Sequence, residues 1–419
     1  MLKEIFFLIR FFNILSIGFI YKQLWGNDEG FLYITKHLAN LNIFILKLLQ
    51  GLSTNSVLLT KKQNEILLQY TDNVPYSQDD IESDFIKYID ILSDNKIKIK
   101  DNTPIQSGAI ALVYKGIYEN KEIVIKVQRK NMRHKIEEAI NHMYMIAKIV
   151  NYFSLVPALN LNLLIHENKE IMLNQTDFIT EVENMNRMKK NCQNIDYLKI
   201  PTVYPEFTRD NNNVIVMEFI EGRKIQELAD EEKDDYAFLL AIFGIFSFLY
   251  NRFYHSDLHA GNILFLKNGE QIQLGILDFG IMGELTKEEQ SIFYEFVNSI
   301  GKKKNDLKKS ANIIMSSFIE SIPNNQNKHE IQHSQIEKEI YILLTTKMNK
   351  NNNFNSNDLY EINKILYQYN LQLSRTFCKV ILAFAISDNV CQEVSHHISY
   401  HEHLEKATNE IFDMSIMEY

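Results

Sequence analysis

The residues best suited to chemistry stand in segment 255–262, HSDLHAGN, and in the tripeptide 278–280, DFG. Phosphoryl transfer needs a carboxylate near the acceptor and oxygen ligands for a Mg²⁺ ion that bridges the phosphates. Magnesium keeps several waters, so one Asn and one Asp can supply its protein ligands. The spacing D-x-x-x-x-N followed by DFG therefore predicts Asp257 as catalytic carboxylate, with Asn262 and Asp278 as metal ligands.

This loop is specific in its composition. Five fixed residues at ~5% usage each would coincide by chance about 10⁻⁴ times in a chain of this length. The alternative is a loop of capping Asp and Asn residues around a satisfied core histidine. We expect His255 and His259 to be structural, and no zinc site from this pair, because the sequence offers no third ligand nearby.

A second candidate is Lys126, which stands in the apolar run 124–127, VIKV. A buried ammonium is costly unless it meets anions, and ATP phosphates together with a glutamate would serve. We predict Glu181, in an expected helix 178–188, as that glutamate and as a third catalytic residue. The alternatives are a lysine whose charge reaches water from an edge strand, and a glutamate on a helix surface.

Upstream of Lys126 a glycine-rich G-x-G-x-x-G loop is missing, and segment 104–113 is PIQSGAIALV. Small residues still allow the backbone to approach phosphates, although with more side chain than a glycine loop has. The predicted nucleotide-binding residues are Lys126 and, from this loop and a later strand, Ser107, Gly108, Ala109, Val113 and Glu218.

The elements that must position these residues follow from hydrophobic periodicity. Strands are expected at 96–101, 111–118, 122–128, 198–204, 214–219, and in a hairpin of 263–266 and 272–277 around Asn268-Gly269. Helices are expected up to about residue 92, at 132–153, 178–188 and 231–254, and throughout the chain after 285 except in loops at 323–333 and 349–357.

This order predicts an α+β, two-lobed, protein-kinase-like fold with an N-terminal helical extension. The expected domains are an apolar helix at 1–27, a helical extension at 28–95, a kinase-like N-lobe with inserted helices at 96–220, and a helical C-lobe with the catalytic loop and DFG at 221–419.

The composition excludes several classes of protein. A hydrophobic share of 46% indicates a folded chain, and a net charge of −9 argues against a nucleic-acid partner. The three cysteines lie far apart without a CxxC pair, which favours a reducing compartment over a disulfide framework.

Residues 1–25 are mostly apolar, but Arg10 and Asn13 interrupt them and no small-residue cleavage site follows. A charge at the centre of a spanning helix costs about 2.5–3.5 kcal/mol. We therefore expect an amphipathic helix that lies on a membrane surface or docks on the rest of the protein. The expected location is cytoplasmic or peripheral to a membrane, with a lipid or membrane surface as a partner.

Together these residues resemble the UbiB family of atypical kinases. The family's H-x-D-P-H-P-G-N loop is similar to 255–262, and its alanine-rich loop is similar to 104–113. Its E-x-D motif resembles 175–177, and its K-x-G-Q motif resembles 47–50. The resemblance implies ATP and Mg²⁺ binding, ATPase or small-molecule kinase activity, and a link to quinone lipids and membranes.

The resemblance also assigns four residues to a family-specific lid over the active site: Lys47, Gln50, Gln175 and Asp177. The sequence departs from the family pattern at Gln175, where a charged partner for Lys47 is lost, and at Leu49, Gly108, Leu258 and Ala260.

Two other classes compete. An aminoglycoside- or choline-kinase-like phosphotransferase would share the catalytic loop but would not explain 47–50. A non-catalytic nucleotide-binding scaffold on a membrane would tolerate the altered lid. An ordinary protein kinase ranks last because no A-P-E-like segment follows the DFG.

Overall fold

The computed structural model describes residues 2–53, 59–60, 62–63, 65–67, 74–77, 80–81, 97–101, 103–153, 161–300, 306–321, 333–348 and 356–398. The chain divides into two compact units. The first comprises Met1–Lys189, Ile200–Ile220 and Asp278–Ile281, and the second comprises Lys190–Lys199, Glu221–Leu277 and Met282–Tyr419.

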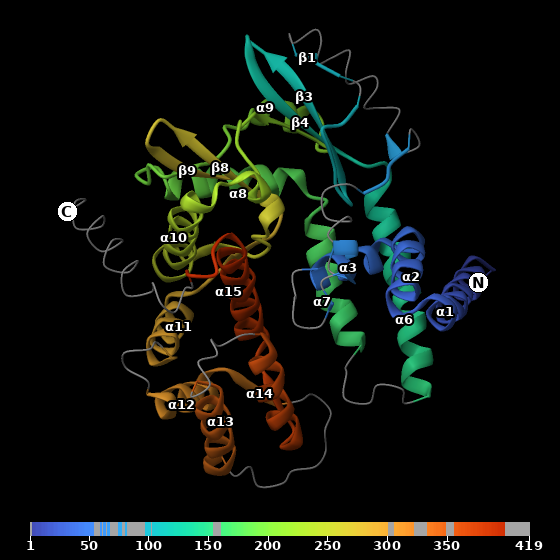
Figure 1. Cartoon of the computed structure of the whole chain (residues 1–419), viewed down its shortest axis with the longest axis vertical. Helices are drawn as coiled ribbons and strands as arrows, with labels where there is room; N and C mark the ends of the chain where they lie inside the picture. Colours follow the sequence, from blue (N-terminus) through green and yellow to red (C-terminus); the bar gives the residue numbers. More distant parts are fainter. Residues whose placement is uncertain are drawn as a thin grey trace. The chain divides into compact units, whose positions relative to one another are not determined.

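The first unit contains an antiparallel sheet in the order β1-β3-β4-β6, with β2 paired to β3. Its strands are β1 (Lys98–Ile99), β2 (Gln106–Ser107), β3 (Ala111–Tyr118), β4 (Lys121–Gln128) and β6 (Val214–Glu218). Glu119 and Asn120, with φ of 48° and 62°, form the tight turn between β3 and β4, whose strands run side by side in Figure 1. Alternate apolar residues of β3 and β4, among them Tyr114 and Ile125, are buried on one face of this sheet.

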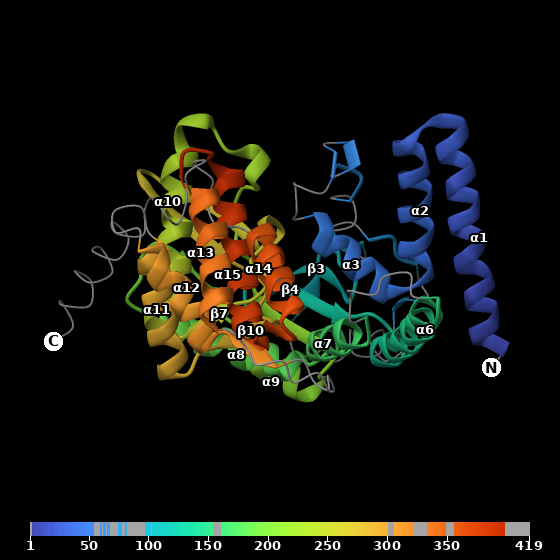
Figure 2. The same cartoon turned by 90° about the horizontal axis from the view of Figure 1, so that it is seen from below.

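The helices of the first unit are α1 (Leu2–Trp25), α2 (Asn27–Leu41), α3 (Ile43–Ser53), α6 (Met132–Tyr152), α7 (Leu161–Asn174), α8 (Phe178–Asn191) and α9 (Pro205–Asp210). Helix α1 lies along α2, as Figure 2 shows. The two helices approach closely where both have glycine, since a Cβ on Gly30 would lie 2.9 Å from the carbonyl oxygen of Gly18. Buried residues of α3 pack with those of α6 and α7 in a separate helical core.

The second unit is mostly helical. It contains α10 (Asp230–Phe246), α11 (Lys287–Ile300), α12 (Leu307–Ser317), α13 (His333–Met348), α14 (Ser356–Gln368) and α15 (Arg375–Val394). The hairpin β8 (Ile263–Asn268) and β9 (Gln271–Ile276) turns at Gly269, whose φ is +65°, and β5 (Leu198–Lys199) adds to β9 in parallel. The short strand β7 (Phe253–His255) pairs with β10 (Met282–Glu284).

Three local expectations were wrong. The strand predicted at 198–204 is limited to β5, because Pro201 has no amide hydrogen to donate and Val203 pairs instead with Met217 of β6. The helix predicted at 231–254 ends at Phe246 and continues as a π-helical turn, after which the segment Phe253–His255 pairs with β10 instead. The all-helical region predicted after 285 contains a strand pair, β11 (Ile319–Ser321) with β12 (Leu371–Leu373). In these cases tertiary pairing overrode local helical periodicity.

The remaining differences are small. The strand predicted at 96–101 is limited to β1 (Lys98–Ile99), and residue 96 lies outside the described residues. The loops predicted at 323–333 and 349–357 also fall almost wholly outside them.

Candidate functional site

Strand β4 presents Lys126 on the face opposite its apolar neighbours. Lys126 stands between Val113 of β3 and Ile215 of β6, while Ile125 and Val127 are buried in the sheet's core. The Lys126 side chain is 13% exposed. Strand periodicity therefore directs a single cation away from the apolar face, as expected for successive residues of a strand.

Two carboxylates meet this cation within the first unit. The Lys126 Nζ atom lies 2.6 Å from Glu181 Oε1 and 3.1 Å from Asp278 Oδ2. Glu181, in the first turn of α8, is buried, whereas the Asp278 side chain is 36% exposed. The ring of Phe178, which is fully buried, has its centroid 5.4 Å from Lys126 Nζ. One buried cation thus joins two acidic groups that the sequence places 55 and 152 residues away.

The charges of this triad do not balance. Burial by itself would lower the pKa of the Lys126 ammonium, but Asp278 and Glu181 outweigh it and raise that pKa. Burial raises the pKa of the Glu181 carboxyl to about 7; Asp278 adds to the rise, while Lys126 opposes it. The two shifts have different causes, since the carboxylates raise the pKa of Lys126 whereas burial raises that of Glu181, and a single cation serves both carboxylates. A further cation beside Asp278 would therefore be stabilised.

The DFG tripeptide is held by the same helix that carries Glu181. Asp278 Oδ1 accepts a hydrogen bond from the Gly280 amide at 2.9 Å, and Asn184 Nδ2 donates to the Phe279 carbonyl oxygen at 3.0 Å. Phe279 is fully buried. Asn184 was missed by the sequence analysis, although it stands three positions after Glu181 and so lies on the same helix face.

The predicted nucleotide loop forms the turn between β2 and β3. The Gly108 amide donates to the Ala111 carbonyl oxygen at 2.9 Å, which leaves Ala109 at the tip of a tight turn, and Val113 is on β3. The Ser107 hydroxyl donates to the Val74 carbonyl oxygen at 2.6 Å and accepts from Arg129. Ser107 would therefore contribute to a nucleotide site through its backbone.

Glu218 ends strand β6. Its Oε2 atom accepts hydrogen bonds from the Thr202 amide at 3.1 Å and from the Thr202 hydroxyl at 3.0 Å. The carboxylate is thus engaged locally, and the Glu218 amide donates to the Thr202 carbonyl oxygen at 2.8 Å.

The four residues assigned to a lid lie on two elements of the first unit. Lys47 and Gln50 are partly buried on α3. Gln175 lies beside the DFG, since a Cβ on Gly280 would come within 3.9 Å of Gln175 Cα. Asp177 caps α8, because its carboxylate accepts from the Thr180 amide at 3.1 Å and from the Thr180 hydroxyl at 2.8 Å.

The second unit holds the catalytic-loop residues. Asn262 Nδ2 donates to the Asp257 carbonyl oxygen at 3.1 Å, which links the two predicted functional residues across the loop. The Nδ1 atom of His255 accepts from the Asp257 amide at 3.1 Å, and Nδ1 of His259 accepts from the Gly261 amide at 3.1 Å. Each histidine thus fixes the backbone two residues ahead of it.

Lys224 also contacts this loop and was not singled out from the sequence. Its Nζ atom donates to the Gly261 carbonyl oxygen at 3.0 Å, next to Asn262. The sequence around Lys224 has no period or spacing that would have pointed to this contact.

Among the described residues, no cluster of three or more His, Cys, Asp or Glu side chains is arranged to hold a metal ion. Magnesium does not need such a cluster, because phosphates and waters supply most of its ligands. In the first unit, the partly exposed carboxylate of Asp278 and the excess negative charge beside Lys126 suit such an ion, while Asn262 belongs to the second unit.

Comparisons with known proteins place the chain in a family. The profile of the ABC1 atypical kinase-like domain matches residues 70–313, more than half of the chain. A probable protein kinase UbiB of Haemophilus ducreyi is 31% identical over 208 residues, which are 46% of this chain and 38% of that protein. The protein sll1770 of Synechocystis sp. is 27% identical over 380 residues, 85% of this chain and 61% of that protein. The chain thus spans less than two thirds of the length of these relatives.

Two solved structures show more distant likeness. The complex of Rv3197 with erythromycin from Mycobacterium tuberculosis is 17% identical, covers 72% of this chain and 75% of that chain, and gives a TM-score of 0.47. The Rio2 kinase of Chaetomium thermophilum with ADP, Mg²⁺ and phosphoaspartate is 10% identical, covers 60% of this chain and 76% of that chain, and gives a TM-score of 0.29.

The profile match and the UbiB relatives confirm the predicted family. The mixed sheet and helices, with α1 to α3 ahead of the sheet, agree with the predicted α+β, two-lobed kinase-like fold and its helical extension. This chain belongs to the ABC1, or UbiB, family of atypical kinase-like proteins.

Proposed function

We propose that this protein is an active atypical kinase or ATPase that binds ATP with Mg²⁺. The observation that carries the proposal is the buried Lys126, which lies within 3.1 Å of both Glu181 and the DFG carboxylate of Asp278. A scaffold without nucleotide chemistry has no need for an ammonium held between two carboxylates in the interior, because desolvation makes that arrangement costly.

The residues divide the work as follows. Glu181 orients Lys126, whose ammonium binds the phosphates, and the turn at Gly108 and Ala109 brings backbone amides to them. Asp257 positions the acceptor hydroxyl or water and takes its proton. Asn262 and Asp278 are the residues that would hold the metal, which would neutralise charge on the phosphates.

Family membership and helix α1 support a proposal for the acceptor. We propose that the phosphate acceptor is a lipid or other small molecule related to quinones, or that the protein hydrolyses ATP in the service of such a molecule. One face of α1 packs on the first unit through Phe7 and Ile14, while its other face exposes eight large apolar side chains: Ile5, Phe6, Ile9, Phe12, Phe19, Ile20, Leu24 and Trp25.

This exposed face supports attachment to a membrane surface, with the protein peripheral to the bilayer. Among the described helices, α1 is long and apolar enough to cross a membrane by length and composition alone. Arg10 within it favours the surface position, because a charge at the bilayer centre costs about 2.5–3.5 kcal/mol.

Thermal-shift binding tests the nucleotide proposal. ATP and ADP, each with and without Mg²⁺, are added to the wild type and to Asp278→Asn, Lys126→Ala and the control Asp230→Asn, whose side chain is 93% exposed. We expect a magnesium-dependent stabilisation that Asp278→Asn loses, that Lys126→Ala weakens and that Asp230→Asn retains. A wild type that shows no shift with any nucleotide would contradict nucleotide binding, and with it both the kinase and the nucleotide-binding scaffold.

A further inference from the structure

Strand β4 ends in three contacts that tie it to different parts of the first unit. Lys126 meets Glu181, and two residues later Gln128 Nε2 donates to the Thr176 carbonyl oxygen at 2.8 Å, just before α8. The next residue, Arg129, turns to the N-terminal extension. The end of the strand that carries Lys126 is therefore a junction between α8 and that extension.

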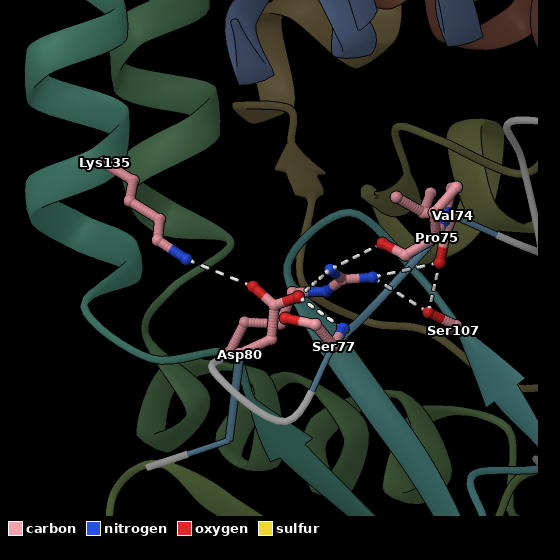
Figure 3. A network of polar contacts seen from close by, with 7 residues as sticks. Val74, Pro75, Ser77, Asp80, Ser107 and Lys135 are labelled. Atoms are coloured by element: carbon pink, nitrogen blue, oxygen red, sulfur yellow. Dashed lines mark hydrogen bonds and ion pairs between the residues drawn. The ribbon is translucent and has the colours of Figure 1, made fainter. Parts of the chain in front are cut away.

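Arg129 is buried, with 7% of its side chain exposed, and its guanidinium is surrounded by acceptors. Nη1 donates to the Pro75 carbonyl oxygen at 3.1 Å and to Asp80 Oδ2 at 3.2 Å. Nη2 donates to the Val74 carbonyl oxygen at 3.2 Å and to the Ser107 hydroxyl at 2.8 Å. Figure 3 shows these four acceptor residues gathered at one point. Such a fork of parallel donors is specific to arginine.

The acceptors come from two separate pieces of chain. Val74, Pro75 and Asp80 belong to the extension, in what we call the 74–80 segment, whereas Ser107 begins the predicted nucleotide loop. Backbone bonds join the same pieces: the Val74 amide donates to the Ser107 carbonyl oxygen at 2.8 Å, and the Lys130 amide donates to that of Asp80 at 2.7 Å.

Arg129 also holds the tip of the nucleotide loop. Its amide donates to the Ile110 carbonyl oxygen at 2.8 Å, next to Ala109. The guanidinium of Arg129 therefore binds one side of the turn 107–111, at Ser107, and its backbone amide binds the other side, at Ile110. Asp80 supplies the charge that a buried guanidinium requires, and its other oxygen lies 3.2 Å from Lys135 Nζ on α6, as Figure 3 also shows.

We propose that Arg129 is a positioning residue that couples the 74–80 segment to the nucleotide loop, so that docking of this segment sets the loop's affinity for ATP. This proposal rests on the proposed function for the identity of the ligand, ATP, whereas the coupling between the 74–80 segment and the loop does not depend on it. Arg129 need not touch the nucleotide. It fixes the turn whose backbone amides would meet the phosphates, and Asp80 fixes Arg129.

The test combines Asp80→Asn and Ser107→Ala in a double-mutant cycle. Both side chains bind the guanidinium, one at Nη1 and one at Nη2, and the structure gives no direct bond between them among the described residues. ATP·Mg²⁺ binding is measured by calorimetry, and amide hydrogen exchange is measured on a peptide covering residues 105–113. Glu137→Gln on α6, 49% exposed, is the control for loss of a surface carboxylate.

We expect Asp80→Asn to weaken ATP binding about tenfold, as expected for loss of one charged hydrogen bond, with an unchanged number of binding sites. Exchange in 105–113 should accelerate, and the double variant should lose less affinity than the product of the two single losses. Glu137→Gln should match the wild type.

A purely structural role would give a different result, because Asp80→Asn would then lower the number of binding sites while the remaining sites keep the wild-type Kd. That outcome, or wild-type exchange in the loop, overturns the inference. If the wild type binds no nucleotide, the proposed function fails, and the exchange data alone decide the coupling. Should Asp80→Asn not fold, Lys135→Gln removes only the outer contact to Asp80 and should give a smaller loss in the same direction.

Discussion

Glu181 Oε1 lies 2.6 Å from Lys126 Nζ, although 55 residues separate the two in the chain. Among the described residues, helices α6 and α7 lie between strand β4 and helix α8 in the chain, yet the fold brings Glu181 of α8 back to Lys126 of β4. Burial raises the pKa of the Glu181 carboxyl to about 7, and Asp278, which shares the same ammonium, adds to the rise. This relationship makes the first unit sensitive to pH.

The unfolding free energy should fall as pH rises from about 4.5 to about 7, the ordinary and folded pKa values of Glu181. The folded pKa is raised, so the stability contributed by the protonated group is complete below the ordinary pKa and is lost as pH passes the folded pKa. The unfolding free energies measured by urea titration at pH 5 and pH 8 should differ by on the order of 1–3 kcal/mol in the wild type, and Glu181→Gln should remove this difference. Equal slopes in the wild type and the variant would show that Glu181 is not the titrating group.

His255→Ala should disorder the catalytic loop. His255 is buried and its Nδ1 accepts from the Asp257 amide, so truncation leaves that amide without its acceptor at a cost of about 1–3 kcal/mol. His255→Asn can offer an oxygen at a similar place and should recover part of the loss. Urea unfolding and ATP hydrolysis check this, and an Asn variant as impaired as the Ala variant would argue that the ring does more than accept one hydrogen bond.

Asp177 can be tested as a helix cap against a role in a lid. Asp177→Ala should cost about 1 kcal/mol of stability, because the Thr180 amide loses its acceptor, whereas Asp177→Ser should keep the cap. If the cap is the main role, the Ser variant hydrolyses ATP at nearly the wild-type rate. If the active site requires the carboxylate instead, both variants should hydrolyse ATP equally slowly, although the stability of the Ser variant is unchanged.

Helix α1 should bring the protein to membranes through its exposed face. Replacing Phe6, Phe19 and Trp25 by Ser should weaken flotation with anionic lipid vesicles at least ~tenfold, since each buried aromatic side chain is worth about 1.5–3 kcal/mol. The matched control replaces Tyr152 and Phe153, which are 83% and 64% exposed on and after α6. Equal loss in both variants would reveal nonspecific adhesion, and flotation unchanged by the α1 substitutions would exclude this helix as the anchor.

Some features of this protein follow from the sequence by itself. The spacing of Asp257, Asn262 and the DFG predicted phosphoryl-transfer chemistry, because metal and phosphate chemistry tolerates few residue types at those positions, and the resemblance of further motifs predicted the family. The hairpins around Asn120 and Gly269 were also predictable, since positive φ at a tight turn selects Asn and Gly. The burial pattern of β4 followed from strand periodicity, which placed Lys126 opposite Ile125.

Tertiary structure decided the rest. Local periodicity could not show that residues 253–255 leave a helix to pair with β10, because that pairing depends on a partner almost thirty residues away. Nor could it show that Arg129, an ordinary cation in the sequence, lies buried among Val74, Asp80 and Ser107. Burial converts such a residue from a solvated charge into one that is held by several fixed hydrogen bonds. Which residues are buried depends on which chain segments fold against one another, and local spacing in the sequence does not contain that information.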